Sequence, residues 1–142
     1  MSWELGWEPM FVDSSAWIAL FSKRDRFHVR ARDMWRQLHD ARRFLLTNDY
    51  VLDETFTLLR RGPNGLLMAE ALHDLITQSR VIEVETVSEE LWQRGWKLFT
   101  RYRDKVLSFT DCVSFAHLQA RDLYEVFTFD GDFERAGFVV RP

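Results

Sequence analysis

Four acidic residues of this 142-residue chain stand where carboxylates can take part in chemistry. They lie where apolar runs end or helical patterns begin, and they are Asp13, Glu54, Asp111 and Asp130. In a parallel α/β sheet the strand ends and the following helix starts share one edge, so these side chains can converge there. Converging carboxylates repel one another, and a hard divalent cation such as Mg²⁺ or Mn²⁺ relieves that repulsion.

Two of these acids also have simpler structural interpretations. Asp13 ends the strand-like run at residues 10–13, and an aspartate there can cap the following helix. Glu54 shares a helical face with Tyr50, Val51 and Leu58, so it is expected to point inward. An inward carboxylate needs a partner because burying it alone is costly, and that partner is either a metal or a simple salt bridge.

The two acids nearer the C-terminus carry the same ambiguity. Asp111 stands three residues after Ser108, which is the spacing of a helix-capping pair. Asp130 directly follows the apolar run at 126–129 and repeats the position of Asp13. Gly131 permits a tight turn, after which Asp132 begins a helical turn. We interpret Asp130 as the fourth site carboxylate and Asp132 as an auxiliary that reaches a metal through water.

The elements that must position these acids alternate along the chain. Strand-like runs cover residues 10–13, 44–47, 81–85, 126–129 and 138–140. Helical patterns cover 14–21, 27–39, 48–61, 66–79 and 108–123, and another begins at Ser88. Nearly wholly apolar strands that alternate with helices predict an α/β fold, a three-layer α/β/α sandwich with a mostly parallel central sheet. The length suits one domain over residues 1–142, with 1–9 as a short N-terminal extension.

Composition narrows the class of protein. The single cysteine, Cys112, excludes an internal disulfide framework, and the four histidines show no metal-ligand spacing. The N-terminus lacks the apolar core of a secretory signal, and no apolar run is long enough to cross a bilayer. We therefore expect a cytoplasmic protein without membrane contact.

Charge is distributed unevenly along the chain. The formal net charge is −3, yet the span from Lys23 to Arg61 holds ten basic and six acidic residues, a local net of 10 − 6 = +4. A local basic surface attracts phosphate, although solvated helix faces would give the same count. The residues predicted to contact a nucleic acid are Lys23, Arg24, Arg26, Arg60 and Arg61.

Four segments, taken in order, resemble the motifs of PIN-domain nucleases. They are residues 12–21 (VDSSAWIALF), the run that ends at Glu54, residues 108–112 (SFTDC) and residues 128–133 (TFDGDF). The resemblance covers about residues 10–142, and the chain is similar in size to the VapC toxins of toxin–antitoxin pairs. It implies an Mg²⁺- or Mn²⁺-dependent endoribonuclease in which a metal-activated water hydrolyses RNA and leaves a 5′-phosphate and a 3′-hydroxyl.

The same resemblance assigns roles to residues and implies partners. Asp13, Glu54, Asp111 and Asp130 match the family's metal-binding carboxylates. The supporting hydroxyl positions are Ser14, Ser108, Thr110 and Thr128. The resemblance also implies a homodimer and a cognate antitoxin whose C-terminal segment covers the cleft.

Two other classes of function remain open from the sequence. A non-catalytic PIN-like module that binds RNA or protein has no need of a repulsive acidic cluster. An aspartyl phosphatase of the haloacid-dehalogenase type requires a second acid two residues after the first, where Ser15 stands here. A receiver domain requires acids before the first strand's aspartate and a lysine after the last strand, and neither is present.

Overall fold

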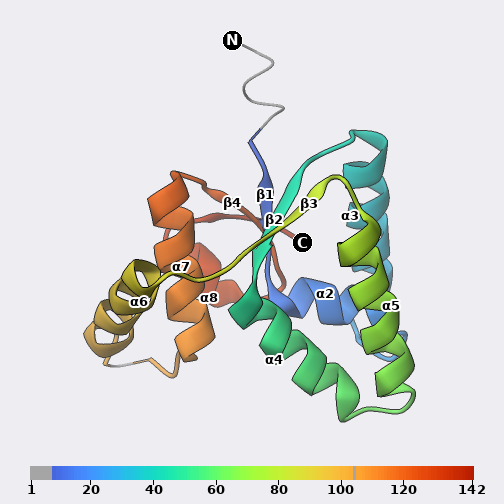
Figure 1. The fold of residues 1–142 in the computed structure, drawn as a ribbon, viewed down its shortest axis with the longest axis horizontal. Coiled ribbons are helices and arrows are strands. Elements are labelled where there is room, and N and C mark those ends of the chain that lie inside the picture. Colours follow the sequence, from blue (N-terminus) through green and yellow to red (C-terminus); the bar gives the residue numbers. More distant parts are fainter. Residues whose placement is uncertain (1–7, 104) are drawn as a thin grey trace.

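A five-stranded parallel sheet lies at the centre of the molecule. The computed structural model describes residues 8–103 and 105–142, and Figure 1 shows the sheet between two groups of helices. Its strands are β1 (Met10–Val12), β2 (Leu45–Asn48), β3 (Ile82–Glu85), β4 (Glu125–Phe127) and β5 (Val139–Arg141), in the order β3-β2-β1-β4-β5. Every strand pair is parallel. Of the predicted N-terminal extension, residues 1–7 lie outside the described residues.

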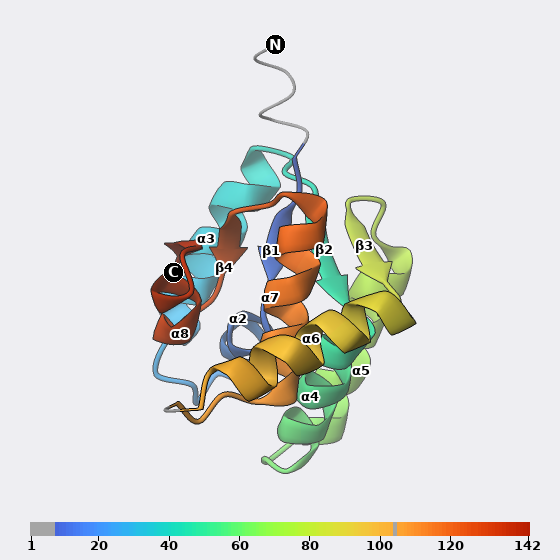
Figure 2. The ribbon, with the colours of Figure 1, turned by 90° about the vertical axis from the view of Figure 1, so that its left-hand side faces the viewer.

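Seven helices of the described residues surround the sheet. They are α2 (Ser14–Phe21), α3 (His28–Asp40), α4 (Asp49–Arg60), α5 (Gly65–Gln78), α6 (Glu89–Arg101), α7 (Phe109–Arg121) and α8 (Gly131–Arg135). Helices α3 and α5 cover one side, and α6 and α7 cover the other (Figures 1 and 2). This arrangement confirms the predicted three-layer α/β/α sandwich.

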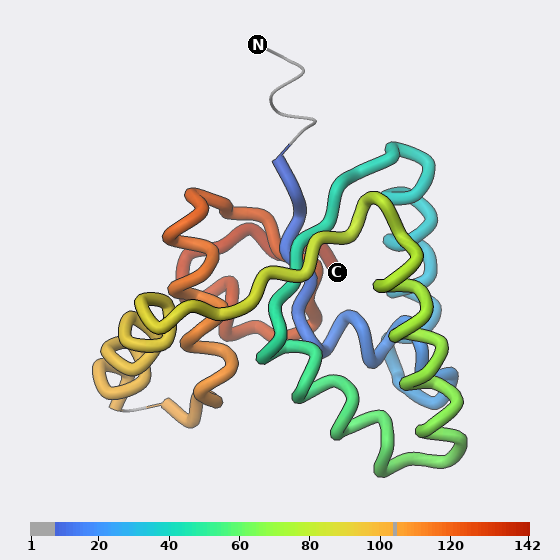
Figure 3. The backbone as a smooth tube through the Cα atoms, in the orientation of Figure 1, coloured from blue at the N-terminus to red at the C-terminus, as the bar shows by residue number. Residues whose placement is uncertain are grey.

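The connection after β3 carries the chain from one layer of helices to the other. Figure 3 shows it passing from α5 through β3 and across the end of the sheet to α6. The first half of the chain thus builds β1 and the strands on one side of it, while the second half adds β4 and β5 on the other side. The order reverses between β1 and β4, which is where open α/β sheets form a crevice at their carboxyl ends.

The central strands of the sheet are more deeply buried than its edges. All three residues of β1 are buried, as are all four of β2, whereas the edge strands β3 and β5 keep exposed polar residues. The largest fully buried side chains include Trp17, Phe11 and Phe115. Complete burial of one such side chain stabilises the fold by about 1.5–3 kcal/mol. No helix among the described residues is long and apolar enough to cross a membrane.

Helix α7 runs through the middle of its layer. Its residues from Asp111 to Leu118 are all buried, because α7 packs between the sheet and α6. The two helices approach closely where Gly95 of α6 meets Val113 of α7: a β-carbon added at Gly95 would lie 2.7 Å from Val113 Cγ2. A glycine is therefore required at that crossing, and the close contact fixes the position of α7 against α6.

Candidate metal centre

Asp13 lies at the carboxyl end of β1, the central strand. It is buried and is the N-cap residue of α2, with Oδ2 accepting a long hydrogen bond of 3.4 Å from the Ser15 backbone N–H. The same oxygen accepts hydrogen bonds from Thr128 Oγ1 at 2.9 Å and from Ser15 Oγ at 3.1 Å. Asp13 Oδ1 is buried and has no hydrogen-bond partner among the described residues. One oxygen is therefore held while the other is free for a ligand.

Asp130 and Asp132 lie across the β1–β4 border from Asp13. Asp130 is the N-cap of the short helix α8, and its Oδ1 accepts a hydrogen bond from the Asp132 backbone N–H at 2.9 Å. Asp132 pairs with Arg135, whose Nη1 lies 2.6 Å from Asp132 Oδ1. Both aspartates are half-buried. The turn at Gly131 thus directs both carboxylates toward the same edge of the sheet.

Asp111 reaches this cluster from the first turn of α7. Carboxylate oxygens of Asp111, Asp130 and Asp132 lie within 4.8 Å of one another. Asp111 also completes a capping box with Ser108: Ser108 Oγ accepts from the Asp111 N–H at 3.0 Å, and Asp111 Oδ2 accepts from the Ser108 N–H at 3.4 Å. Asp111 therefore both caps α7, as its spacing from Ser108 suggested, and lies in the cluster of carboxylates.

Glu54 approaches from the other side of the crevice, on α4. It is half-buried, and Ser14 Oγ donates a hydrogen bond of 2.5 Å to Glu54 Oε1. Its charge acts on Asp111, as do those of Asp13 and Asp130. All four predicted carboxylates are therefore close enough to interact, and Asp132 lies in the same cluster.

Two of these carboxyl groups have raised pKa values. Burial raises the pKa of Asp111 to about 7, and repulsion from Asp13, Asp130 and Glu54 adds to the shift. Burial also raises the pKa of Asp13 to about 6, although its hydrogen bonds with Thr128 and Ser15 oppose the shift. The crevice thus favours either bound protons or a bound cation.

The residues present fit a hard divalent cation. The donors are all carboxylate oxygens, which Mg²⁺ and Mn²⁺ prefer, and the orphaned Oδ1 of Asp13 is a buried acceptor that lacks a donor. Among the described residues the cluster forms one ion pair, that of Asp132 with Arg135, so most of its negative charge is uncompensated. The acidic cluster supports a metal-binding site without identifying the ion.

The predicted supporting hydroxyls differ in what they do. Ser14 holds Glu54, Ser108 caps α7 and Thr128 holds Asp13. Thr110 is half-buried and makes no side-chain hydrogen bond with the described residues. Sequence reasoning missed Ser15, whose Oγ contacts both Asp13 and Thr128 and accepts the Phe129 N–H at 2.9 Å. Ser15 could have been found from the sequence, because a serine two residues after an aspartate is typical of a local turn closed by side-chain hydrogen bonds.

The predicted nucleic-acid contacts lie at different distances from the carboxylates. Lys23 and Arg24 follow the C-terminal end of α2 and line an apolar groove of about 530 Å³ against α5. Arg60 is the last residue of α4 and Arg61 its C-cap, about 9–11 Å along the helix axis from Glu54. Arg26 lies over the ring of Phe27, which stacks on Phe129 beside Asp130. Only Arg26 of the five is thus linked by direct ring contacts to the loop that carries Asp130.

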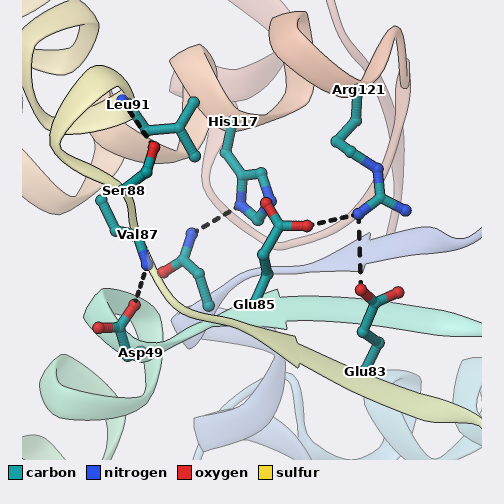
Figure 4. Close-up of polar contacts among 9 residues, drawn as sticks. Asp49, Glu83, Glu85, Val87, Ser88, Leu91, His117 and Arg121 are labelled. Atoms are coloured by element: carbon teal, nitrogen blue, oxygen red, sulfur yellow. Dashed lines mark hydrogen bonds and ion pairs between the residues drawn. The ribbon is translucent and has the colours of Figure 1, made fainter.

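A buried polar network holds together the two helices that carry Glu54 and Asp111. The imidazole of His117, on α7, is fully buried, and its Nδ1 lies 3.1 Å from Asn48 Nδ2 (Figure 4). Asn48 Oδ1 accepts the Val51 N–H at the start of α4, so its Nδ2 must donate to His117 Nδ1. His117 is therefore neutral and carries its proton on Nε2.

The other side of this imidazole faces the edge strand β3. His117 Nε2 lies 2.8 Å from Glu85 Oε2, at an angle outside ordinary hydrogen-bond limits. Arg121 Nη1 binds Glu85 Oε1 at 2.6 Å and lies 3.6 Å from Glu83 Oε2. Burial lowers the pKa of His117, against an opposing effect of Glu85. The network thus connects β2, β3, α4 and α7 behind the carboxylates.

A parallel sheet with a carboxylate crevice at its β1–β4 border defines a class of α/β proteins built to hold a divalent cation. Within that class, residues 10–139 match the model of the PIN domain family. A curated relative from Mycobacterium tuberculosis, the 23S rRNA-specific endonuclease VapC20, is 37% identical over 136 residues, which cover 94% of this chain and 98% of the relative. The chain therefore belongs to the PIN-domain family.

Solved structures agree with that assignment. The crystal structure of Mycobacterium tuberculosis VapC20, described as a sarcin–ricin loop cleaving toxin, superposes with a TM-score of 0.84 and 35% identity, and the match covers 94% of this chain and 99% of that one. VapBC2 from Rickettsia felis, solved on a DNA fragment from its promoter, gives a TM-score of 0.70 at 12% identity over 94% and 98% of the two chains, which shows the shared fold. The chain is an endoribonuclease of the VapC toxin class, and the predicted family and enzyme class are confirmed.

Proposed function

We propose that this chain cleaves one phosphodiester bond of 23S ribosomal RNA. The support is the relative's specificity, which accompanies 37% identity over almost the whole of both chains. The observation that carries the chemistry is the convergence of Asp111, Asp130 and Asp132 within 4.8 Å at the β1–β4 border, beside Asp13. Such a cluster can receive a phosphate only with a cation present, because carboxylates alone repel it.

We assign the cation to Mg²⁺ or Mn²⁺ and its ligands to Asp13, Asp111 and Asp130, with Glu54 and Asp132 completing the set. When bound, such an ion lowers the pKa of a water and neutralises charge on the scissile phosphate. The chain's own residues supply orientation. Ser15 and Thr128 hold Asp13 Oδ2, which leaves Oδ1 unpaired among the described residues, and Ser14 holds Glu54.

A cleavage assay tests this function directly. The substrate is an RNA hairpin that carries the sarcin–ricin loop of 23S rRNA, incubated with Mg²⁺ or Mn²⁺. We expect one cut that leaves a 5′-phosphate and a 3′-hydroxyl, and we expect EDTA or Asp13→Asn to abolish it. A protein that binds the hairpin but never cuts it, with or without either ion, would favour the non-catalytic RNA-binding module.

We further propose that the protein is a homodimer and that its interface includes the outer face of α6. Trp92, Trp96 and Phe99 are 39–47% exposed on that face. Their rings pack against Phe109 of α7, which also contacts Tyr50 of α4. A contiguous aromatic surface of this kind suits a self-complementary interface better than solvent.

Light scattering after size exclusion tests the dimer. We expect the mass of two chains for the wild type and of one chain for Trp96→Glu, since a charge in an apolar interface is costly. Val106→Glu, at an apolar side chain that is fully exposed, is the matched control and should remain dimeric. A wild-type mass of one chain would reject the dimer. Lost RNA binding by a Trp96→Glu protein that stays dimeric would make the aromatic face an RNA surface.

The remaining proposals concern partners, location and domain organisation. We propose a cognate antitoxin whose C-terminal segment covers the crevice, a cytoplasmic location and a single domain over residues 1–142. The relatives' toxin class supports the first, and the single buried Cys112 suits the second. Co-expression with the small protein of the adjacent reading frame tests the antitoxin: a complex that no longer cuts the hairpin is expected.

A further inference from the structure

Two stacked phenyl rings and two arginines form a surface beside the carboxylates. The rings of Phe27 and Phe129 are parallel, with an interplanar angle of 2° and centroids 4.6 Å apart. The Arg26 guanidinium lies 4.5 Å from the Phe27 centroid, and that of Arg30 lies 5.8 Å from both ring centroids. We call these four residues the arginine–phenylalanine stack.

Local hydrogen bonds hold each half of the stack in place. On one half, Asp25 Oδ1 accepts the Phe27 N–H at 2.8 Å, which fixes the loop between α2 and α3. On the other half, Ser15 Oγ accepts the Phe129 N–H at 2.9 Å, and Ser15 in turn contacts Asp13. The stack is therefore attached to the same hydrogen bonds that orient the carboxylate of Asp13.

The position of Phe129 places the stack at the rim of the crevice. Phe129 stands between Thr128, which holds Asp13, and Asp130, which belongs to the acidic cluster. Consecutive residues are about 3.8 Å apart, so the ring that supports Arg30 begins one residue from a proposed metal ligand. A strand whose scissile phosphate lies at the carboxylates must pass close to this rim.

The guanidinium groups of Arg26 and Arg30 are available to bind an anion. Both side chains are exposed, and among the described residues neither forms an ion pair. A guanidinium stacked on a ring keeps its N–H donors in its own plane, where they can bind a phosphate with two parallel hydrogen bonds. Stacking also holds the long side chain in place, so that less conformational entropy is lost on binding.

We propose that Arg26 and Arg30, held by Phe27 and Phe129, bind backbone phosphates next to the scissile one and so position the RNA strand. This inference rests on the proposed ribonuclease function and adds a phosphate-binding surface to it. The occupant is the RNA backbone because a strand whose scissile phosphate lies at the carboxylates carries its next phosphates past Phe129, the neighbour of Asp130. An acidic protein segment is the competing occupant that the test must distinguish.

Steady-state cleavage of the sarcin–ricin hairpin in Mg²⁺ or Mn²⁺ is the measurement. We expect Arg26→Ala and Arg30→Ala each to raise KM about tenfold, with kcat little changed, because each loses a phosphate contact of about 1.4 kcal/mol. Arg32→Ala is the matched control: it removes another exposed arginine, which shares α3 with Arg30 but, among the described residues, lines a groove between α2 and α3 and makes no contact with the stack. It should leave KM within about twofold.

Salt dependence separates phosphate binding from a structural role of the stack. In the Asp13→Asn background, which we expect to bind the hairpin without cutting it, the double variant Arg26→Ala/Arg30→Ala should reduce the slope of log affinity against log salt by about 1.4, or about 0.7 per phosphate on single-stranded RNA. Phe27→Leu keeps both charges and should keep most of that slope. Arg30→Lys should recover part of the affinity, because charge remains while the planar donors are lost.

The outcomes separate the proposed phosphate binding by Arg26 and Arg30 from the proposed ribonuclease function. If the wild type cleaves and the double variant matches Arg32→Ala in KM and salt slope, the phosphate role is wrong and the ribonuclease stands. If the double variant loses antitoxin binding while its KM is unchanged, the surface belongs to an acidic protein segment instead. A wild type that neither binds nor cleaves the hairpin overturns both proposals.

Discussion

Asp13 shows how one side chain can be both fixed and available. Its Oδ2 is engaged by Thr128 and Ser15, whereas its Oδ1 has no partner among the described residues despite being buried. An unpaired buried acceptor costs about 1–3 kcal/mol, so the fold retains this carboxylate at the expense of stability. Such a cost is expected at a ligand site, where the bound ion compensates for it.

At the scale of single residues, we predict that Asp130→Asn loses more cleavage activity than Asp132→Asn. Asp132 is partly neutralised by Arg135, 2.6 Å away, while Asp130 has no cationic partner among the described residues. We expect Asp130→Asn to reduce kcat/KM on the hairpin by more than about 100-fold and Asp132→Asn by about tenfold. Glu134→Gln, an exposed change on α8, should have no effect. The opposite order would make Asp132 the principal ligand.

The raised pKa values predict that metal binding strengthens with pH. Below about pH 4 Asp13 and Asp111 are protonated in both folded and unfolded chains. Between about pH 4 and their folded pKa values, about 6 and about 7, the folded protein keeps protons that the unfolded chain releases. In the metal-free protein, the stability that these two protonated groups contribute is therefore lost as pH rises through that window. Metal binding becomes stronger over the same range, because fewer protons compete with the ion for the carboxylates.

Thermal melting with and without millimolar Mn²⁺ measures this effect. We expect the increase in Tm caused by Mn²⁺ to be larger at pH 8 than at pH 5.5. Asp13→Asn/Asp111→Asn removes both titrating groups and should give a small increase in Tm that is the same at both pH values. Equal increases for the wild type at the two pH values would show that protons and the ion do not share these carboxylates.

The sequence predicted the positions of the carboxylates better than their directions. Asp13 and Asp130 could be located because an acid that ends a buried strand must lie at the sheet's carboxyl edge. The place of Asp132 in the cluster could not, because it depends on the turn at Gly131 and on the contact with Arg135. Ser15 was missed for a related reason: its hydroxyl serves residues that are 113 and 114 positions away.

At the scale of elements, the network around His117 joins α7 to the start of α4. Its members come from β2, β3 and α7, and Asn48 is at once the N-cap of α4 and the donor to the imidazole. Periodicity predicted these helices and strands within one or two residues. It could not reveal the network, because no spacing along the chain links His117 with Asn48 or Glu85.

We predict that His117→Leu destabilises the protein by about 2–3 kcal/mol, because Asn48 Nδ2 loses its acceptor and Glu85 its buried neighbour. Chemical unfolding measures this change. His39→Leu, at an exposed histidine, is the control and should be nearly neutral. Because burial lowers the pKa of His117, its contribution to the free energy of unfolding depends on pH. That contribution is present above about pH 6.5 and is lost as pH falls toward the pKa of the folded state. A His117→Leu protein as stable as the wild type would show that the network carries no net energy.

The crossing of α6 and α7 gives a second prediction for the elements. Gly95→Ala gains about 1 kcal/mol of helix propensity but places a methyl group 2.7 Å from Val113 Cγ2 and 3.0 Å from Val113 Cα. The second contact is with backbone and cannot be relieved by a rotamer change, so we expect a net loss of about 1–2 kcal/mol in unfolding free energy.

Gly62→Ala is the matched control, since its added carbon meets only Leu59 O at an ordinary 3.7 Å. It should be neutral or stabilising. A Gly95→Ala protein that is more stable than the wild type would mean that α6 moves freely against α7, and the two helices would then not form a fixed pair.

At the scale of the whole molecule, both halves of the chain supply carboxylates to the crevice. Asp13 and Glu54 come from the first half, while Asp111, Asp130 and Asp132 come from the second. The proposed set of ligands therefore needs both halves, which meet at the β1–β4 pairing. The alternation of elements indicated the three layers, whereas the position of this border depends on strand order, which is set by packing between distant segments.

We predict that the two halves unfold together, as the single-domain proposal requires. Far-ultraviolet circular dichroism reports helices from both halves, and near-ultraviolet signals report packed aromatic rings, among them Trp17 against Trp35. Their thermal transitions should coincide, and Tm should rise with protein concentration if the dimer forms. Two separate transitions would show that the halves are independent domains.

The passage of the chain across the sheet after β3 has a practical consequence. A break between Glu85 and Glu89 would leave Asp13 and Glu54 on one fragment and Asp111, Asp130 and Asp132 on the other, so we expect neither fragment to cut RNA while apart. Fused to a pair of interacting proteins, the fragments would regain the crevice only when that pair meets. The same crossing that builds the nuclease therefore marks a place to divide it into a two-part reporter whose separate pieces a cell can tolerate.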